Sequence, residues 1–188
     1  GLAAYGYDWT EGKNVGTAVS FDQIIATAQN AGAKIAFNDD TYNLDFSYKD
    51  EGNGTLHHVF FPDAATTFNI MRFGTQYHMA GFGLWRLGTE DKRIWRFYGK
   101  DMAWENASKL SVSKLMQLNG TDDVNFVGSG EVLNVTSEPH HGKIAVTIDK
   151  DNCLITEEYY QALPTTYTIQ RLGKCKPKQL VLTFDDGP

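Results

Sequence analysis

The chain has 188 residues, 41% of them hydrophobic and 13% aromatic, which suffices for the core of one domain or of two small ones. Its net charge of −6 and the lack of any run of Lys or Arg argue against a nucleic-acid partner, whose phosphates require a basic face. The same charge disfavours other anionic polymers. No apolar run approaches the roughly 20 residues of a membrane-spanning helix.

The chain opens on a predicted strand, residues 1–9, followed by turn chemistry over residues 10–16. Ser20 is placed to cap an amphipathic helix that Gly32 ends. The apolar residues of this helix recur at helical spacing: Phe21, Ile24, Ile25 and Ala28. Three short strands are expected next, and we expect them to form an antiparallel sheet: residues 34–37, 41–48 and 55–61.

Pro62 and Asp63 predict the start of a second helix, which runs toward residue 77 and is weakened by Gly74. A strand over residues 79–85 follows and ends in Trp85. Thr89 is the expected N-cap of a third helix, and Glu90 and Asp91 would lie at its positive end. This alternation of strand and helix is typical of β/α units. Two β/α fragments therefore flank the antiparallel insert.

The sequence pattern becomes mixed after Tyr98, which suggests a domain boundary near residue 105. Ser108 is a candidate cap for a short helix through Leu118. Beyond it the pattern predicts only strands: 124–127, 131–136, 143–149, 153–156, 166–171 and 179–184. Cys153 and Cys175 are too few for a disulfide scaffold and lack the spacing of zinc ligands, so they either pair or remain ordinary thiols.

Three stretches, residues 1–9, 57–63 and 81–91, resemble in that order the C-terminal part of family 18 glycoside hydrolases, the group of chitinases and spore-cortex glucosaminidases. In that family a TIM-type barrel carries a small α+β insertion between its seventh and eighth strands. The resemblance implies that residues 1–104 form the C-terminal part of such a barrel, with the insertion at about residues 10–60.

The expected fold class is therefore α+β. Partial TIM-barrel β/α units flank a small antiparallel insertion, and a β-rich connecting module, residues 105–178, follows. The barrel strands would leave an exposed apolar edge, and a homodimer is one way to cover it.

The resemblance implies that Trp85 is the aromatic floor beneath the sugar at the cleavage point. An indole presented flat at the rim of a barrel can bury the apolar face of a sugar ring. Tyr5, Tyr7, Asp8 and Trp9 would lie at the neighbouring strand end and bind substrate with it. The alternative is that Trp85 is an ordinary core aromatic and that the other four residues serve packing.

The catalytic signature of that family, Asp-x-x-Asp-x-Asp-x-Glu, is absent from the chain. The carboxylate pairs Asp39–Asp40, Glu90–Asp91 and Asp122–Asp123 are better interpreted as caps and solvated charges than as catalytic acids. We therefore expect this segment alone to be inactive in glycosidic bond hydrolysis.

The last residues, Leu182 to Pro188, resemble the opening motif of NodB-type polysaccharide deacetylases, and residues 179–188 would begin such a domain. The resemblance implies that Asp185 is a general base and that Asp186 ligates a divalent metal such as zinc with two later histidines. The adjacent His140 and His141 are poor substitutes for that pair. No cofactor is expected within the segment itself.

We thus expect the chain to be a segment of a larger, multidomain, extracytoplasmic carbohydrate-active enzyme. The whole would cleave and deacetylate a polysaccharide that contains N-acetylglucosamine, such as chitin, peptidoglycan or an exopolysaccharide. Two alternatives are open: a structural spacer, or a non-catalytic carbohydrate-binding or scaffold module that uses exposed aromatics, namely Trp9, Trp85, Tyr42 and Tyr48.

Overall fold

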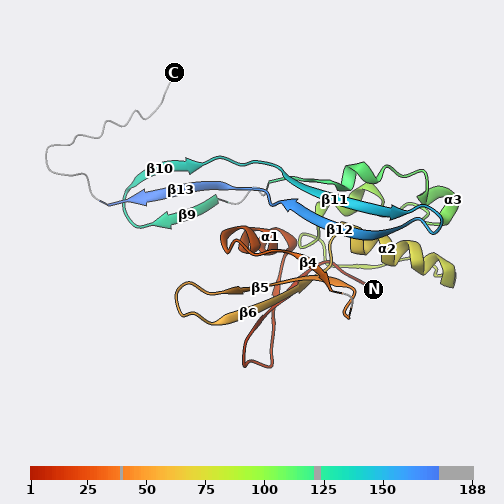
Figure 1. The fold of residues 1–188 in the computed structure, drawn as a ribbon, viewed down its shortest axis with the longest axis horizontal. Coiled ribbons are helices and arrows are strands. Elements are labelled where there is room, and N and C mark those ends of the chain that lie inside the picture. Colours follow the sequence, from red (N-terminus) through yellow and green to blue (C-terminus); the bar gives the residue numbers. More distant parts are fainter. Residues whose placement is uncertain (39, 121–123, 174–188) are drawn as a thin grey trace, which may run out of the picture.

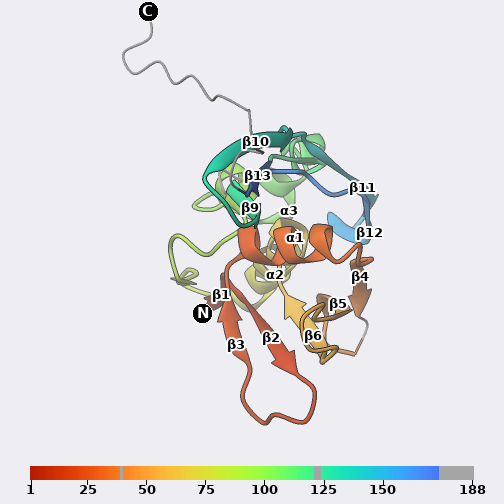
Figure 2. The same cartoon turned by 90° about the vertical axis from the view of Figure 1, so that its left-hand side faces the viewer.

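A computed structural model of the protein describes residues 1–38, 40–120 and 124–173. Over these ranges the fold is α+β, as predicted, with mostly sheets, few helices and no closed barrel. Helix α1 (Phe21–Asn30) lies between a five-stranded sheet and the strands of the C-terminal half (Figure 1 and Figure 2). The expected TIM-barrel units are not seen among the described residues beyond one short parallel strand pair.

The predicted first strand is two strands that join different sheets. Strand β1 (Leu2–Ala3) pairs in parallel with β7 (Leu84–Trp85), whereas β2 (Gly6–Thr10) enters the five-stranded sheet. Gly6, the first residue of β2, has no side chain to clash with its neighbours. A Cβ at this position would lie 2.6 Å from the Phe60 carbonyl oxygen and 2.7 Å from Cδ1 of Ile24. The chain can thus pass closely beneath α1.

The five-stranded sheet has the order β3-β2-β6-β5-β4 and is antiparallel throughout. The three predicted strands are confirmed as β4 (Ala36–Asn38), β5 (Asn43–Lys49) and β6 (Leu56–Phe61). Strand β3 (Thr17–Val19) was not predicted. The predicted first helix is confirmed as α1, whose cap Ser20 forms a capping box with Gln23. The helix covers one face of the sheet.

The predicted second helix is confirmed as α2 (Ala64–Gly74), with Asp63 as its N-cap and a 3-10 turn, η1 (Thr75–Tyr77), after it. The predicted third helix is wrong, because residues 92–96 form the 3-10 helix η2 (Lys92–Arg96) and its N-cap is Asp91. The Thr89 hydroxyl donates back to the Arg86 carbonyl oxygen (2.8 Å), and Thr89 is not the cap of η2.

The predicted helix after Ser108 is also wrong. Ser108 ends a short helix, α3 (Trp104–Ala107), and its amide donates to the Trp104 carbonyl oxygen. A 3-10 helix, η3 (Val112–Leu115), and a short strand, β8 (Gln117–Leu118), complete this region.

The β-rich half forms two three-stranded sheets, β12-β11-β8 and β10-β13-β9. The pattern predicted five of these six strands, all except β8: β9 (Val124–Gly128), β10 (Val132–Ser137), β11 (Gly142–Asp149), β12 (Leu154–Ala162) and β13 (Tyr167–Leu172). Strand β12 is longer than expected. The strand predicted at residues 179–184 lies outside the described residues.

Two hydrophobic clusters form the core, and each combines residues from before and after residue 105. The first joins Phe68, Ile94 and Phe97 to Ile155 of β12, and the second joins α1 and the five-stranded sheet to Ile144 of β11. Burying one such side chain stabilises the fold by about 1.5–3 kcal/mol. The predicted division near residue 105 stays a prediction, since a shared core does not locate a boundary.

Candidate functional site

Trp85 ends β7 with its indole in solvent. Its side chain is 68% exposed, so the alternative interpretation as a core aromatic does not hold. The backbone is fixed, because the amide of Ala4 donates to the Trp85 carbonyl oxygen (2.8 Å) and Ala3 pairs with Trp85 across the parallel strands. The exposed indole of Trp85 is therefore attached to a backbone that hydrogen bonds fix in place.

A pocket of about 260 Å³ lies beside Trp85. Both apolar and polar residues line it: Tyr5, Ala18, Val19, Ser20, Gln23, Arg86 and Thr89. An apolar ring next to hydroxyl, amide and guanidinium groups suits a ligand with one apolar face and several hydroxyls.

Three of the predicted residues continue from this pocket along β2. The rings of Tyr5 and Tyr7 meet edge to face at 5.5 Å between centroids, and those of Tyr7 and Trp9 lie 6.0 Å apart. Tyr7 is 40% and Trp9 36% exposed, on the face of the sheet that α1 does not cover. We call Trp85, Tyr5, Tyr7 and Trp9 the aromatic strip. A hydrogen bond to Tyr5 raises the pKa of the Tyr7 phenol.

Asp8 lies on the opposite face of β2, because successive side chains of a strand alternate. Its Oδ1 is 2.7 Å from Nδ1 of His57, and its Oδ2 accepts a hydrogen bond from the Tyr48 hydroxyl (2.7 Å). The rings of Tyr48 and His57 stack at 4.8 Å. Burial, and then the bond to Asp8, raise the pKa of Tyr48. The structure thus separates Asp8 from the aromatic strip and gives it two partners on neighbouring strands.

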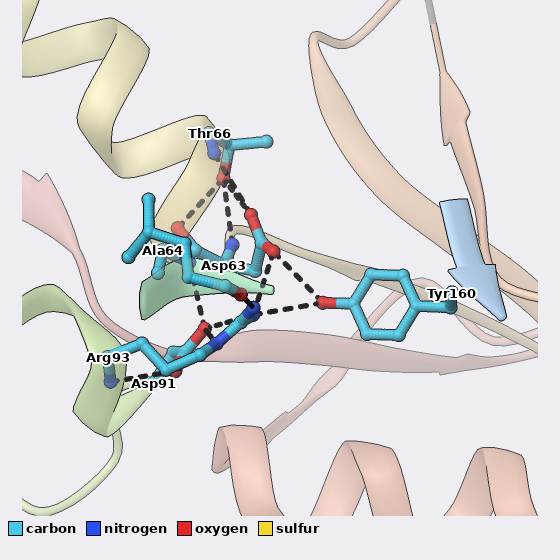
Figure 3. Close-up of polar contacts among 7 residues, drawn as sticks. Asp63, Ala64, Thr66, Asp91, Arg93 and Tyr160 are labelled. Carbon is cyan, nitrogen blue, oxygen red and sulfur yellow. Dashed lines mark hydrogen bonds and ion pairs between the residues drawn. The ribbon is translucent and has the colours of Figure 1, made fainter. Parts of the chain in front are cut away.

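A buried charged network includes Asp91, the last residue of the loop of residues 86–91 that follows Trp85, together with Asp63 and Arg93 (Figure 3). Arg93 Nη2 donates to Asp91 Oδ2 at 2.6 Å and to Asp63 Oδ2 at 3.1 Å. Asp91 Oδ2 also accepts the amide of Ala64 (2.9 Å), and Tyr160 donates its hydroxyl to Asp63 (2.9 Å). The network therefore ties the start of α2, the loop after Trp85 and strand β12 together.

The network shifts the pKa values of Asp63 and Glu158 in opposite directions. Burial favours a raised pKa for Asp63, but the Arg93 guanidinium and hydrogen bonds to the carboxylate outweigh it and lower that pKa. Burial, and then the neighbouring Asp63 carboxylate, raise the pKa of Glu158 well above its ordinary value. The buried Oε1 of Glu158 has no hydrogen-bond partner among the described residues. This network is suited to structural support.

Sequence reasoning identified only part of this network. Asp63 lies at the predicted start of α2 and caps it, since its Oδ1 accepts the Thr66 amide (2.9 Å). Asp91 is a cap, as predicted, since its Oδ1 accepts the Arg93 amide (3.0 Å), but it is not a solvated charge, because its side chain is buried against Arg93. Arg93, Glu158 and Tyr160 were missed, and no local pattern could have revealed them, since 97 residues separate Tyr160 from Asp63.

Glu90, the other member of the predicted Glu90–Asp91 pair, forms two hydrogen bonds that fix the loop of residues 86–91. Its Oε2 accepts the amide of Gly88 (2.6 Å) and its Oε1 accepts Nε1 of Trp95 (3.2 Å). The first bond satisfies a backbone amide of the turn. The second connects the loop to the side chain of Trp95.

The proposed deacetylase residues Asp185 and Asp186 lie outside the described residues, as does Cys175. In the part of the chain that the structure describes, no three His, Cys, Asp or Glu side chains gather in a way that could hold a metal ion. Cys153 is buried, and burial raises the pKa of its thiol. No helix over the described ranges is long and apolar enough to cross a membrane.

Comparison with known proteins gives a partial match. No protein-family model matches the chain. Over 97 residues, 51% of this chain, it is 29% identical to an uncharacterized glycosylase, YvbX, of Bacillus subtilis. The chain spans 28% of the length of that relative.

Solved structures with a similar segment each cover 50% of this chain. The spore cortex-lytic enzyme SleL of Bacillus megaterium is 28% identical, with a TM-score of 0.46 over 23% of its chain. A chitinase of Chromobacterium violaceum is 28% identical, with a TM-score of 0.46 over 29% of its chain. SleL of Bacillus cereus is 26% identical, with a TM-score of 0.47 over 23% of its chain.

Proposed function

We propose that the chain is the sugar-binding part of a carbohydrate-active enzyme that modifies a polysaccharide. The observation that carries the proposal is the exposed Trp85 at the end of β7, beside a pocket lined by polar side chains. The 29% identity to a glycosylase over half of the chain supports the same role. The enzyme as a whole would act outside the cytoplasm, where such polymers are found.

The finer proposal is that the chain belongs to the C-terminal part of a family 18 glycoside hydrolase. Trp85 would then lie beneath the sugar at the cleavage point, and Tyr5, Tyr7 and Trp9 would continue the binding surface along β2. The substrate class is a polymer that contains N-acetylglucosamine. An indole can bury the apolar C–H face of the ring while Gln23, Arg86 and Thr89 contact its hydroxyl groups.

The described residues bind and orient rather than cleave. No carboxyl group lines the pocket beside Trp85, whereas protonation of a glycosidic oxygen needs a carboxylic acid within hydrogen-bond reach. Asp8, the one acid among the predicted site residues of the described part, is engaged by His57 and Tyr48 on the other face of β2. We infer that the catalytic acid belongs to another part of the enzyme.

The deacetylase part of the proposal concerns Asp185 as base and Asp186 as a ligand of a divalent metal. Both residues lie outside the described ranges, and the motif places the remaining metal ligands, two histidines, further along the chain. Deacetylation therefore rests on the sequence motif alone.

A second candidate function is a binding module without an enzymatic parent. The aromatic strip favours it, because four neighbouring aromatic side chains, Trp85, Tyr5, Tyr7 and Trp9, can bind several sugar rings without any catalytic group. The coding sequence on either side distinguishes the two candidates. The enzymatic parent requires the acidic signature upstream and a His-x-x-x-His motif downstream.

The binding proposal is tested by titrating the chain with a chito-oligosaccharide while following tryptophan fluorescence. We expect saturable binding that Trp85→Ala abolishes. Trp104→Phe is the matched control, because Trp104 is also exposed but lies elsewhere and bonds to the Asp151 carbonyl. If Trp85→Ala binds the oligosaccharide as the unchanged chain does, Trp85 is no sugar platform and the proposal fails.

A further inference from the structure

A second concave surface lies beyond the loop that follows Trp85. Two adjoining pockets, of about 230 and 260 Å³, share Trp95, Arg96 and Lys114 in their linings. Lys92 lines the first pocket and Lys100 lines the second. We call this surface, lined by Lys92, Trp95, Arg96, Lys100 and Lys114, the basic groove.

The cations of the groove are largely unpaired. The Lys92 ammonium lies 3.5 Å from a carboxylate oxygen of Asp22, as an exposed ion pair. Arg96, Lys100 and Lys114 are exposed, and in the described part of the chain no carboxylate lies within 4.0 Å of their charged groups. Three positive charges therefore face the same concave surface without a neutralising partner.

The buried Arg93 adds no free charge to the groove. It also lines the first pocket, but its guanidinium is engaged by Asp91 and Asp63. Asp91 and Asp63 thus neutralise the buried Arg93, and Asp22, which also lines the first pocket, pairs with Lys92 at the surface. Arg96, Lys100 and Lys114 have no such partner within 4.0 Å in the described part of the chain. The net charge of −6 is a sum over the whole chain and does not describe this groove.

Trp95 supplies an aromatic wall that is held from two sides. Its indole is 45% exposed, donates through Nε1 to Glu90 and meets the Tyr98 ring edge to face at 5.3 Å. The amide side chains of Gln117 and Asn119 line the same pocket. A held aromatic ring, neutral amides and unpaired cations together match a sugar ring that carries an anionic group.

We propose that the basic groove binds an acidic saccharide, a sugar ring that bears a carboxylate or a phosphate. The ring stacks on Trp95, and the anionic group contacts Arg96 and Lys114, which border both pockets. The site is separate from the aromatic strip, because Arg86 and Thr89 line the pocket beside Trp85 whereas Asp91 and Lys92 line the groove. The proposal therefore does not depend on the role of Trp85.

The test uses calorimetric titration of the chain with three sugar probes and, for comparison, uridine monophosphate. N-acetylmuramic acid carries a carboxylate, N-acetylglucosamine 6-phosphate carries a phosphate, and N-acetylglucosamine is neutral. We expect an acidic probe to bind and the neutral one not to, and the tighter acidic probe identifies the source of the anion. Binding should weaken as salt is added, because the cations are exposed to solvent.

Variants locate the binding. Arg96→Gln and Lys114→Gln should each weaken the acidic probe about tenfold or more, the loss of one charged hydrogen bond. Lys109→Gln removes the same charge from an exposed residue that lines neither pocket, and should leave the affinity unchanged. Trp85→Ala should also leave it unchanged, which separates this site from the proposed sugar platform.

Four results would each overturn the proposal. The first is that neither acidic probe binds, and the second is that the neutral sugar binds as tightly as an acidic one. The third is that Lys109→Gln and Lys114→Gln lower the affinity for the acidic probe equally. The fourth is that Trp85→Ala abolishes binding of the acidic probe. Tighter binding of uridine monophosphate than of both acidic sugars would assign the groove to a nucleotide instead, and would equally reject an acidic saccharide.

Discussion

The guanidinium of Arg93 donates to the carboxylate of Asp63 across 30 residues of sequence, with Nη2 and Oδ2 3.1 Å apart and both side chains buried. Asp63 begins α2, and Arg93 belongs to the segment that follows the Trp85 loop. The pair therefore fixes the loop to a helix terminus. Its removal tests how much of the fold depends on this connection.

Replacing Arg93 by Met should lower the free energy of unfolding by about 3–5 kcal/mol, because Asp63 and Asp91 would stay buried without their cation. Urea denaturation followed by circular dichroism measures the loss. Arg96→Met is the matched control, since this exposed neighbour should change stability by about 0.5 kcal/mol or less. Equal effects of the two substitutions would contradict a supporting role for the network.

Glu158 should make stability depend on pH. Its pKa in the folded chain is raised above the ordinary value of 4.5. The stability that it contributes is therefore complete below that pH and is lost as the pH rises through the folded pKa. Glu158→Gln removes this dependence, so the variant should gain stability relative to the unchanged chain as the pH rises above about 4.5.

Urea denaturation at a series of pH values measures that gain. Glu157→Gln changes an exposed neighbour on the same strand and should show a much smaller trend. Asp63 responds in the opposite direction, since its pKa is lowered and its contribution disappears as the pH falls below about 3.8. A stability difference between Glu158→Gln and the unchanged chain that is constant with pH would show that Glu158 does not titrate as inferred.

Asp8→Ala should destabilise the chain by about 1–3 kcal/mol, because the Tyr48 hydroxyl and Nδ1 of His57 lose their common acceptor. The pKa of Tyr48 should fall at the same time, since the carboxylate is one of the causes that raise it. Thermal denaturation and a spectroscopic titration of tyrosine measure the two effects. Thr10→Ala, on the same face of β2, is the control; a loss there as large as in Asp8→Ala would argue against a specific role of the carboxylate.

Asn69 of α2 pairs with the backbone of β12 as a neighbouring strand would. Its Oδ1 accepts the Ile155 amide (2.8 Å) and its Nδ2 donates to the Ile155 carbonyl (2.7 Å). Asn69→Ala should cost about 1–3 kcal/mol in denaturant unfolding. Asn69→Asp keeps the acceptor but loses the donor, so it should also destabilise. If both variants unfold like the unchanged chain, β12 does not need this connection.

The parts of the fold that sequence predicts are those with local causes. Ser20 caps its helix as expected, α2 begins after Asp63 as predicted, and the strands of the antiparallel sheet follow from their alternation. The 3-10 helix after Asp91 has an apolar side like that of an α-helix, and which residue caps it depends on the turn made by Thr89. Local patterns do not decide such choices.

The candidate site shows the same limit. The importance of Trp85 came from a family resemblance, and its exposure came from the structure. Alternation along β2 would have sufficed to place Asp8 on one face and Tyr7 and Trp9 on the other. The basic groove could not have been found, because Lys114 and Arg96 line the same pockets only through the packing of η3 against η2.

The hydrogen bond from the Phe21 amide to the Thr89 carbonyl (2.9 Å) anchors the loop of residues 86–91 at the start of α1. Because this loop lies between the pocket beside Trp85 and the basic groove, their spacing is fixed by the fold. One polymer that reaches both sites would bind the second at a high effective concentration, but only if its repeat matched that spacing. The spacing that the loop sets would then favour ligands long enough to reach both sites. Short acidic sugars would bind far more weakly than a polymer of the right repeat.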